Sequence, residues 1–221
     1  MLSVLIVAAG NSTRMGGNNK QLLTIDGIPV IKRSVKAFCD IPEVLEILVA
    51  VKPDDVPEFT KLLSSFENVK VIGTGGDTRQ TTVKQSLEYV SDKANYIAIH
   101  DGARPLVQKD DIIKTFKKAE ETGGAVLGVM VKDTIKIIEN DTVKETPLRH
   151  TVFAVQTPQI FELSEYKKAF ETAEKQGLDF TDDSQLFEKT GRVVTPVIGH
   201  YENIKITTPD DIAVAEAYLK R

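Results

Sequence analysis

The stretch Ser3-Val4-Leu5-Ile6-Val7-Ala8-Ala9-Gly10 is a short apolar run that passes directly into a loop beginning with glycine. Similar short runs rich in β-branched residues recur along the chain, with longer amphipathic stretches between them. This alternation is typical of βαβ units around a parallel sheet. We therefore predict an α/β fold, a Rossmann-like three-layer sandwich with a mostly parallel sheet, formed by residues 1–221 as one domain.

The same periodicity predicts the individual elements. The buried strands are expected at Ser3–Ala8, Leu45–Val51, Val69–Ile72, Tyr96–His100, Ala125–Val131 and Val193–Val197. The helices are expected at Pro29–Phe38, Pro57–Phe66, Arg79–Val90, Lys109–Glu121, Ser164–Gln176, Asp182–Lys189 and Pro209–Leu219. Several of these helices begin with Asp, Ser or Pro, which are favoured at a helix start.

Residues 132–155 interrupt the alternation of strands and helices. Thr134–Ile138 and Thr142–Glu145 are short β-prone runs on either side of Glu139-Asn140-Asp141, a sequence typical of a hairpin turn. A short strand at Thr151–Val155 would follow. We interpret residues 132–155 as a protruding β-arm of the main sheet rather than a second domain.

Composition excludes several classes of protein. The 221 residues include 28 Lys and Arg against 32 Asp and Glu, a formal net charge of −4, which argues against binding nucleic acid through its phosphates. The apolar runs fall far short of the roughly 20 residues that a membrane helix needs. Cys39 is the single cysteine and cannot form an intrachain disulfide, so we expect a soluble protein of the reducing cytoplasm.

The loop after the first strand is the first candidate site. Small residues there let backbone N–H groups approach a phosphate or a base closely. The loop matches neither the Walker pattern nor the three-glycine dinucleotide pattern, but it carries two cations, Arg14 and Lys20. A triphosphate needs positive charge near its bridging oxygens as pyrophosphate departs. The simpler interpretation is a solvated glycine turn with two surface cations.

Two further strand ends carry candidate residues. Gly73-Thr74-Gly75-Gly76-Asp77-Thr78 joins a strand to a helix and could present backbone groups to a base edge, or could be only a tight turn. Asp101 follows an apolar strand, where a carboxylate can hold a ribose hydroxyl or a hydrated Mg²⁺. Arg104 could bind a phosphate through two N–H groups, or could simply pair with Asp101. His100 is expected to close the strand end rather than to act as a base.

Other charged residues are weak signals when taken alone. Lys205 lies in a β-prone run at the close of the sheet, where a cation needs an anionic partner or extends to solvent. Asp182 and Asp183 could be catalytic carboxylates, but after Thr181 the simpler interpretation is that they cap a helix.

Together, these motifs resemble the 2-C-methyl-D-erythritol 4-phosphate cytidylyltransferase family of the non-mevalonate isoprenoid pathway, and the resemblance runs in order from Val4 to Leu219. The residues that carry it are Ala8-Ala9-Gly10, Arg14-Met15, Lys20, Gly75-Gly76-Asp77, His100-Asp101-Gly102-Ala103-Arg104-Pro105, Val131-Lys132-Asp133-Thr134, Gln156-Thr157-Pro158-Gln159, Thr181-Asp182-Asp183 and Asn203-Ile204-Lys205.

The resemblance implies a role for each matching residue. The implied catalytic residues are Arg14, Lys20, Lys205 and Arg149. The implied nucleotide-binding residues are Ala8, Ala9, Gly10, Gly76, Asp77, Thr82 and Asp101, and Asp101 would also bind the metal. The implied residues for the methylerythritol phosphate are Arg104, Thr134, Arg149, Thr181 and Lys205. Residues 132–155 match the arm through which family members form homodimers, so Thr134 and Arg149 should reach the neighbour's site.

The implied reaction uses Mg²⁺ and converts CTP and methylerythritol 4-phosphate into the cytidine diphosphate derivative and pyrophosphate. A phosphate monoester has a second pKa of about 6, so its oxygen is already an anion and needs no general base. Three alternatives are a ribitol 5-phosphate cytidylyltransferase, a non-catalytic nucleotide-binding module and a nicotinamide-dependent oxidoreductase. The first loop differs from the Leu-Ala-Gly-Gly of the ribitol family, and the missing third glycine argues against the oxidoreductase.

Overall fold

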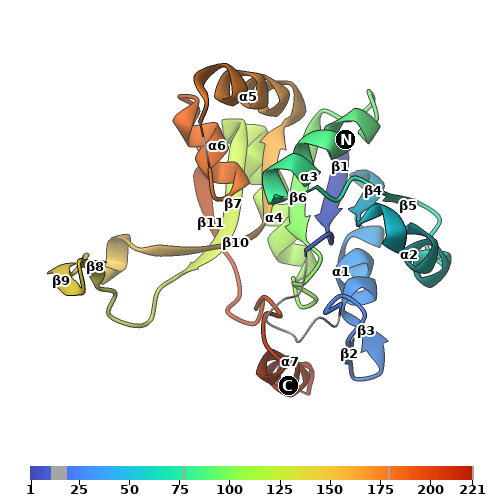
Figure 1. Cartoon of the computed structure of the whole chain (residues 1–221), viewed down its shortest axis with the longest axis horizontal. Helices are drawn as coiled ribbons and strands as arrows, with labels where there is room; N and C mark the ends of the chain where they lie inside the picture. The colour runs from blue at the N-terminus through green and yellow to red at the C-terminus, as the bar shows by residue number, and fades with distance from the viewer. Residues whose placement is uncertain (11–18, 77, 179, 221) are drawn as a thin grey trace.

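The fold is built on a seven-stranded sheet with the strand order β11-β7-β10-β6-β1-β4-β5 (Figure 1). The computed structural model describes residues 1–10, 19–76, 78–178 and 180–220. The strands of the sheet are β1 (Leu2–Val7), β4 (Val44–Ala50), β5 (Val69–Ile72), β6 (Tyr96–Asp101), β7 (Gly124–Met130), β10 (Phe153–Glu162) and β11 (Thr195–Ile198). Only β10 runs antiparallel to its neighbours, β6 and β7. The predicted mostly parallel sheet is confirmed.

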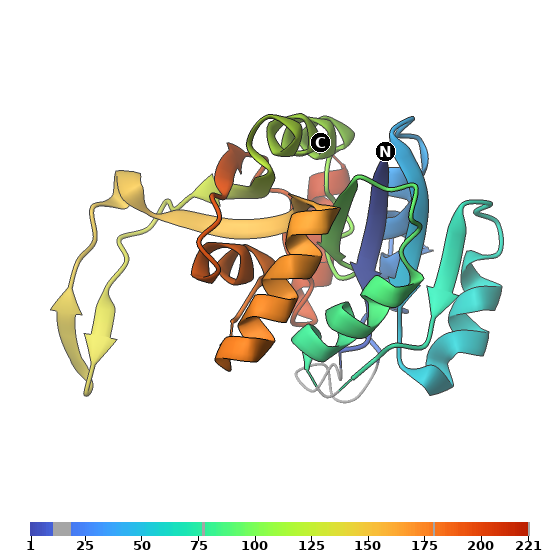
Figure 2. The ribbon, with the colours of Figure 1, turned by 90° about the horizontal axis from the view of Figure 1, so that it is seen from above.

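Helices cover both faces of this sheet (Figure 2). The helices are α1 (Val30–Cys39), α2 (Val56–Leu63), α3 (Arg79–Ser86), α4 (Lys109–Thr122), α5 (Leu163–Gln176), α6 (Asp183–Lys189) and α7 (Asp210–Leu219), of which α1 to α6 cover the sheet. Apolar side chains of α1, α2 and α4 pack on one face, and those of α3, α5 and α6 pack on the other. The result is the three-layer sandwich that the sequence predicts.

Strand β1 shows why the opening sequence specifies a central position. Val4 and Ile6 pack into the core under α1, α2 and α4, whereas Leu5 packs into the core under α3, α5 and α6. Successive side chains of a strand point to opposite faces, so a strand covered on both faces must be apolar throughout. β1 pairs in parallel with both β4 and β6, which brings the loops after these strands to one edge of the sheet.

Strand β10 is the main difference from the predicted elements. The predicted strand ended at Val155, but β10 continues to Glu162 and fills the gap between β6 and β7. Its polar segment Gln156-Thr157-Pro158-Gln159 masks the strand pattern, because proline cannot donate to a ladder. The register with β7 shifts between Val155 and Gln159, which accommodates Pro158.

Two other local expectations are wrong. The run around Lys205 forms no strand, and Ile206 instead donates its backbone N–H to the oxygen of Ala103 at 2.8 Å. The helix predicted at Arg79–Val90 ends at Ser86 and continues as a 3₁₀ turn at Leu87–Tyr89.

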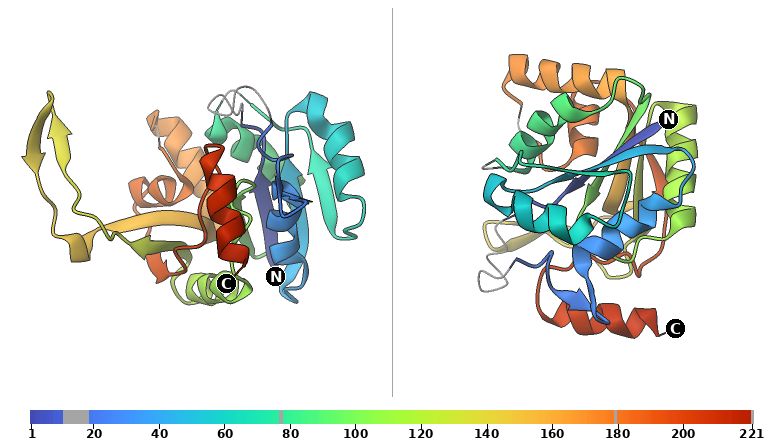
Figure 3. Two further views of the ribbon diagram at one scale, coloured as in Figure 1. Left: turned by 90° about the horizontal axis from the view of Figure 1, so that it is seen from below. Right: turned by 90° about the vertical axis from the view of Figure 1, so that its right-hand side faces the viewer.

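A small hairpin of β2 (Thr24–Ile25) and β3 (Ile28–Pro29) packs beside α7 (Figure 3).

The segment between β7 and β10 extends away from the sheet as a long arm ending in a hairpin (Figure 3). The hairpin pairs β8 (Ile137–Glu139) with β9 (Thr142–Glu145), and its turn residues Asn140 and Asp141 have φ values of 49° and 58°. Positive φ at both central residues is what a tight hairpin turn of this hand requires. The arm exposes large apolar side chains, with Ile138 65% exposed and Leu148 66% exposed.

None of the helices in the described part of the chain is both long enough and apolar enough to span a membrane.

Candidate active site

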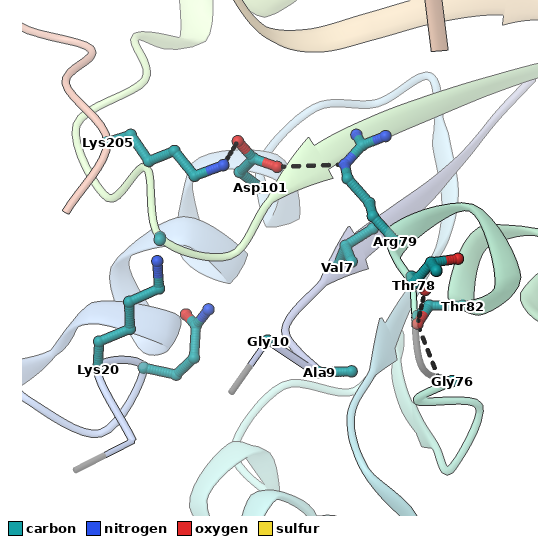
Figure 4. Close-up of a pocket in the computed structure, with 12 residues that line it drawn as sticks. Val7, Ala9, Gly10, Lys20, Gly76, Thr78, Arg79, Thr82, Asp101 and Lys205 are labelled. Atoms are coloured by element: carbon teal, nitrogen blue, oxygen red, sulfur yellow. Dashed lines mark hydrogen bonds and ion pairs between the residues drawn. The ribbon is translucent and has the colours of Figure 1, made fainter. Parts of the chain in front are cut away.

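A pocket lies at the carboxyl ends of β1 and β6, where α/β proteins bind their ligands (Figure 4). Its described lining residues come from the end of β1 and the loop that follows it, the segment leading to α1, the loop before α3, α3 itself, the end of β6 and the segment before α7. They are Val7, Ala9, Gly10, Lys20, Gln21, Gly76, Thr78, Arg79, Thr82, Asp101, Ala103 and Lys205. Among them, Lys20, Arg79 and Lys205 are cations and Asp101 is the anion, so the pocket suits a phosphorylated ligand.

The loop before α3 is held close to β1 by its small residues and its hydrogen bonds. A Cβ added at Gly75 would lie 2.9 Å from both the Cβ of Ala9 and the oxygen of Val51, so only glycine fits. The buried Thr82 hydroxyl accepts the N–H of Gly76 at 3.1 Å and donates to the oxygen of Thr78 at 3.1 Å. Thr82 therefore shapes the wall of the pocket on which Gly76 lies.

Asp101 is the centre of the charged groups. Its carboxylate lies 2.8 Å from Nζ of Lys205, 3.5 Å from Nε of Arg104 and 3.7 Å from Nε of Arg79. Burial raises the pKa of Asp101, but attraction to Lys205, Arg79 and Arg104 outweighs it and holds this pKa well below its ordinary value. Asp101 is thus an anion at every physiological pH, and three cations converge on it.

His100 supports the end of β6 and does not line the pocket. It is fully buried, and its ring contacts the oxygen of Arg104 at 3.2 Å through Nε2 and the Thr157 hydroxyl at 3.0 Å through Nδ1. Thr157 also accepts the backbone N–H of Asp101 at 3.0 Å. Burial lowers the pKa of His100 to about 4, despite the opposing attraction of Asp101. The imidazole is neutral and fully engaged, as expected for a residue that closes the strand end.

Arg104 pairs with Asp101 and is held by a second contact outside the pocket lining. Its Nη1 donates to the oxygen of Asn203 at 2.7 Å, while the side chain of Asn203 donates to Gln156 and to the Thr157 oxygen, each at 3.0 Å. Burial lowers the pKa of Arg104, partly offset by Asp101. Arg104 therefore fixes Asp101 and the segment leading to Lys205 in this chain, and it does not line the described pocket.

Arg79 was not assigned a role from the sequence, although it lines the pocket. Its Nη2 lies 2.6 Å from a carboxylate oxygen of Asp183, whose side chain is only 1% exposed. Asp182 caps α6 by accepting the N–H of Gln185 at 2.9 Å, as predicted. The same interpretation is wrong for Asp183, which pairs with Arg79. An arginine at the start of a helix beside a glycine loop was the signal available in the sequence.

The remaining predicted residues divide by position. Ala9, Gly10, Lys20, Gly76, Thr82, Asp101 and Lys205 line the pocket, while Ala8 lies buried beside it. Arg14 and Asp77 lie outside the described residues. Thr181 lies near the start of α6, where its hydroxyl contacts Oε1 of Gln185 at 3.4 Å. Thr134 and Arg149 lie on the exposed arm, away from this chain's pocket, and Arg149 donates to the oxygen of Lys132 at 3.2 Å.

The residues around Asp101 fit a magnesium ion that arrives with a nucleotide. No cluster of three or more His, Cys, Asp or Glu side chains suited to a metal occurs in the part of the chain that the structure describes. Mg²⁺ does not need such a cluster, because it is commonly held by one or two carboxylates together with substrate phosphates and waters. Asp101 supplies an ionised, hard oxygen donor at the pocket wall.

The fold and the pocket together define an α/β protein with a cation-lined pocket at the carboxyl ends of its strands, which suits a phosphorylated ligand. A family model described as 2-C-methyl-D-erythritol 4-phosphate cytidylyltransferase matches residues 2–221. The chain therefore belongs to the 2-C-methyl-D-erythritol 4-phosphate cytidylyltransferase family, which confirms the resemblance seen in the sequence.

Individual relatives are similar to this chain over nearly its whole length. It is 42% identical to the 2-C-methyl-D-erythritol 4-phosphate cytidylyltransferase of Caldanaerobacter subterraneus subsp. tengcongensis, over 100% of this chain and 99% of the relative. It is 41% identical to the enzyme of the same name from Clostridioides difficile, over 99% and 94%. Among solved structures, the 4-diphosphocytidyl-2C-methyl-D-erythritol synthase of Anaerococcus prevotii superposes with a TM-score of 0.90 at 31% identity, over 100% and 96%.

Proposed function

We propose that the protein transfers the cytidylyl group of CTP to 2-C-methyl-D-erythritol 4-phosphate and releases pyrophosphate, within non-mevalonate isoprenoid biosynthesis. The observation that carries the proposal is the pocket itself, in which Lys205 and Arg79 pair with the ionised carboxylate of Asp101 at the strand ends and Lys20 adds a third cation to the lining. Family membership supplies the identity of the two substrates.

The chemistry requires positioning and charge more than a protein nucleophile. A phosphate monoester has a second pKa of about 6, so the attacking oxygen is anionic at neutral pH. It forms a bond to the α-phosphorus of CTP while the bond from that phosphorus to the bridging oxygen breaks, and the electron pair leaves with pyrophosphate. The obstacle is repulsion between two anions, which Lys20 and Lys205 relieve as cations lining the pocket (Figure 4). His100 is not required as a base.

Recognition of cytosine is assigned to backbone groups rather than to a charged side chain. Ala9, Gly10 and Gly76 line one part of the pocket, and small residues leave their N–H and C=O groups within reach of a base edge. A pyrimidine fits such a narrow opening better than a purine does. Asp77, which the family resemblance places here, lies outside the described residues.

Magnesium is proposed as the cofactor, with Asp101 as the protein residue that would hold it. When bound, the ion supplies positive charge to the phosphates as charge moves toward the leaving group. Lys205 and Arg104 keep Asp101 ionised and oriented. The single cysteine, Cys39, fits a reducing cytoplasm as the place of the reaction.

A homodimer formed through residues 132–155 is the proposed assembly. The arm cannot bury Ile138, Val143 and Leu148 in its own chain, where these side chains are exposed. A second copy of the chain is a surface that could cover them. In that arrangement Thr134 and Arg149 would bind the methylerythritol phosphate of the neighbouring subunit together with that subunit's Thr181.

Subunit mixing tests the role of Arg149 in the neighbour's site. Arg149→Ala and Lys20→Ala are each expected to be nearly inactive alone. In a mixed dimer, one site carries both lesions and the other carries neither, so about half of the mixed dimers' sites should regain activity. The matched control mixes Lys20→Ala with Asp101→Asn, two lesions of the same pocket, which should restore nothing. No recovery by Arg149→Ala despite demonstrated exchange would place Arg149 outside the neighbour's site.

A substrate panel tests the proposed reaction. Purified protein and Mg²⁺ are incubated with each of the four ribonucleoside triphosphates and either methylerythritol 4-phosphate or ribitol 5-phosphate, and pyrophosphate release is measured. We expect release only with CTP and methylerythritol 4-phosphate. Faster reaction with ribitol 5-phosphate would reassign the acceptor, turnover of ATP would contradict the backbone pocket for cytosine, and no release with any pair would contradict the proposal.

A further inference from the structure

A row of polar side chains connects α5 and α6 to the pocket, and its members on α5 and α6 are buried. Tyr166 of α5 donates its hydroxyl to one carboxylate oxygen of Asp183, and the other oxygen lies 2.6 Å from Nη2 of Arg79. Nε of the same guanidinium lies 3.7 Å from the carboxylate of Asp101. Arg79 is therefore shared unequally between the Asp183 carboxylate of the core and the Asp101 carboxylate of the pocket. Figure 4 shows the pair that Arg79 makes with Asp101.

The core end of this row of polar side chains is fully packed. Asp183 is 1% exposed at its side chain, and Tyr166 is fully buried, with its ring stacked on Phe161 at a centroid distance of 5.0 Å and an interplanar angle of 8°. A buried carboxylate is costly unless it is paired and hydrogen-bonded. Asp183 meets that need with Tyr166 and Arg79, so the place of its charge is fixed by packing.

We propose that Asp183 is a positioning residue for cytidylyl transfer that acts through Arg79, because it draws the guanidinium to 2.6 Å and leaves Asp101 available to the ligands of the pocket. The inference rests on the proposed function. It extends that function because Arg79 connects the start of α6 with Asp101, the carboxylate proposed to hold the metal ion of the nucleotide. Thr181 and Asp182 lie just before α6.

The physical reason is competition for one cation. Without the negative charge of Asp183, the guanidinium has Asp101 as its remaining carboxylate partner among the described contacts and turns toward it. A closer Arg79–Asp101 pair would occupy the carboxylate that the nucleotide and its metal ion need. Loss of a residue that orients a ligand-binding group commonly costs about 10–100-fold in affinity or activity, and we expect an effect of that size.

Asp183→Asn is the primary variant, since the amide keeps the shape of the side chain and its contact with Tyr166. We expect kcat to fall by about 10–100-fold and the dissociation constant of the Mn²⁺–CTP complex, measured by titration calorimetry, to rise by about the same factor. Asp111→Asn is the matched control. Asp111 is another fully buried carboxylate, which accepts the His200 backbone N–H at 3.1 Å, and it lies outside the pocket. The control should lower the unfolding temperature without changing Mn²⁺–CTP binding.

A double-mutant cycle separates action through Arg79 from a general structural effect. If Asp183 acts through Arg79, then adding Asp183→Asn to Arg79→Gln should change kcat and the Mn²⁺–CTP dissociation constant by less than about twofold. If the two losses multiply instead, the proposal is wrong. Tyr166→Phe provides a second route should Asp183→Asn not fold. It removes the hydroxyl that fixes Asp183, and its smaller loss should likewise vanish in the Arg79→Gln background.

The outcomes for the inference and for the proposed function are distinct. The wild-type enzyme could be active while Asp183→Asn and Tyr166→Phe keep its kinetic constants and its Mn²⁺–CTP affinity. That result would overturn the inference and leave the proposed function in place. A wild-type protein inactive with CTP and methylerythritol 4-phosphate would overturn the proposed function. In that case the Mn²⁺–CTP titrations of the same cycle would still decide whether Asp183 positions Arg79.

Discussion

Replacing Asp101 with asparagine lowers kcat/KM for CTP by about 10³-fold, the largest single effect that the site predicts. The change removes the one carboxylate on which Lys205, Arg104 and Arg79 converge, and with it the proposed magnesium ligand. The three cations would then repel one another in a partly buried space. Steady-state pyrophosphate release over a range of Mg²⁺ concentrations measures the loss, and higher Mg²⁺ should not restore the activity.

The control for Asp101 is Glu46→Gln at the opposite end of the sheet. The Glu46 carboxylate accepts the Ser3 hydroxyl at 2.8 Å and the Ser91 backbone N–H at 2.7 Å, so it also makes two structural hydrogen bonds. Its loss should reduce stability and leave kcat/KM within about twofold. If Asp101→Asn retained activity near that of Glu46→Gln, the carboxylate would have no part in catalysis.

Replacing Lys20 with alanine has the second largest expected effect, a fall in kcat of about 10²–10³-fold with a much smaller change in the KM for CTP. Lys20 lines the pocket near Lys205 and Asp101, where negative charge develops as pyrophosphate departs. An interaction that strengthens in the transition state affects kcat more than ground-state binding. Initial rates at saturating and limiting CTP separate the two constants.

Lys84→Ala is the matched control for Lys20. Lys84 lies on α3, pairs with Glu174 on the surface and does not line the pocket. Its removal should leave both constants close to those of the wild type. Should Lys20→Ala raise KM for CTP while kcat stays near normal, Lys20 would bind the ground state and the transition state equally.

Much of the fold could be predicted because strands buried on both faces of the sheet leave uninterrupted apolar runs in the sequence. The strands at Val69–Ile72 and Tyr96–Asp101 were located to within one residue from their β-branched runs alone. The extent of β10 could not be predicted, because Pro158 and its polar neighbours do not read as a strand. The structure accommodates them through a register shift between Val155 and Gln159. The segment containing Lys205 resembles a strand in composition, yet no ladder holds it. Its contacts include the backbone hydrogen bond from Ile206 to Ala103 and the bond from Nη1 of Arg104 to the oxygen of Asn203.

The site was predicted less completely than the fold. Lys20, Gly76, Asp101 and Lys205 are far apart in the sequence, and the pocket brings them together as the motif order and the family resemblance implied. Arg79 begins α3 and Asp183 begins α6, so the two residues lie far apart in the sequence. No local sequence pattern distinguishes a carboxylate with a buried ion-pair partner from one that caps a helix. The roles of Thr134 and Arg149 depend on a second chain and stay predictions.

In the proposed reaction, the acceptor's own phosphate oxygen attacks the α-phosphorus of CTP. Methylerythritol 4-phosphate labelled with ¹⁸O in its three non-bridging phosphate oxygens is incubated with CTP, Mg²⁺ and the protein, and both products are weighed by mass spectrometry. We predict that all three labels appear in 4-diphosphocytidyl-2-C-methyl-D-erythritol and that pyrophosphate carries none. Label in pyrophosphate, loss of label from the nucleotide product, or absence of that product would show that the acceptor phosphate is not the nucleophile.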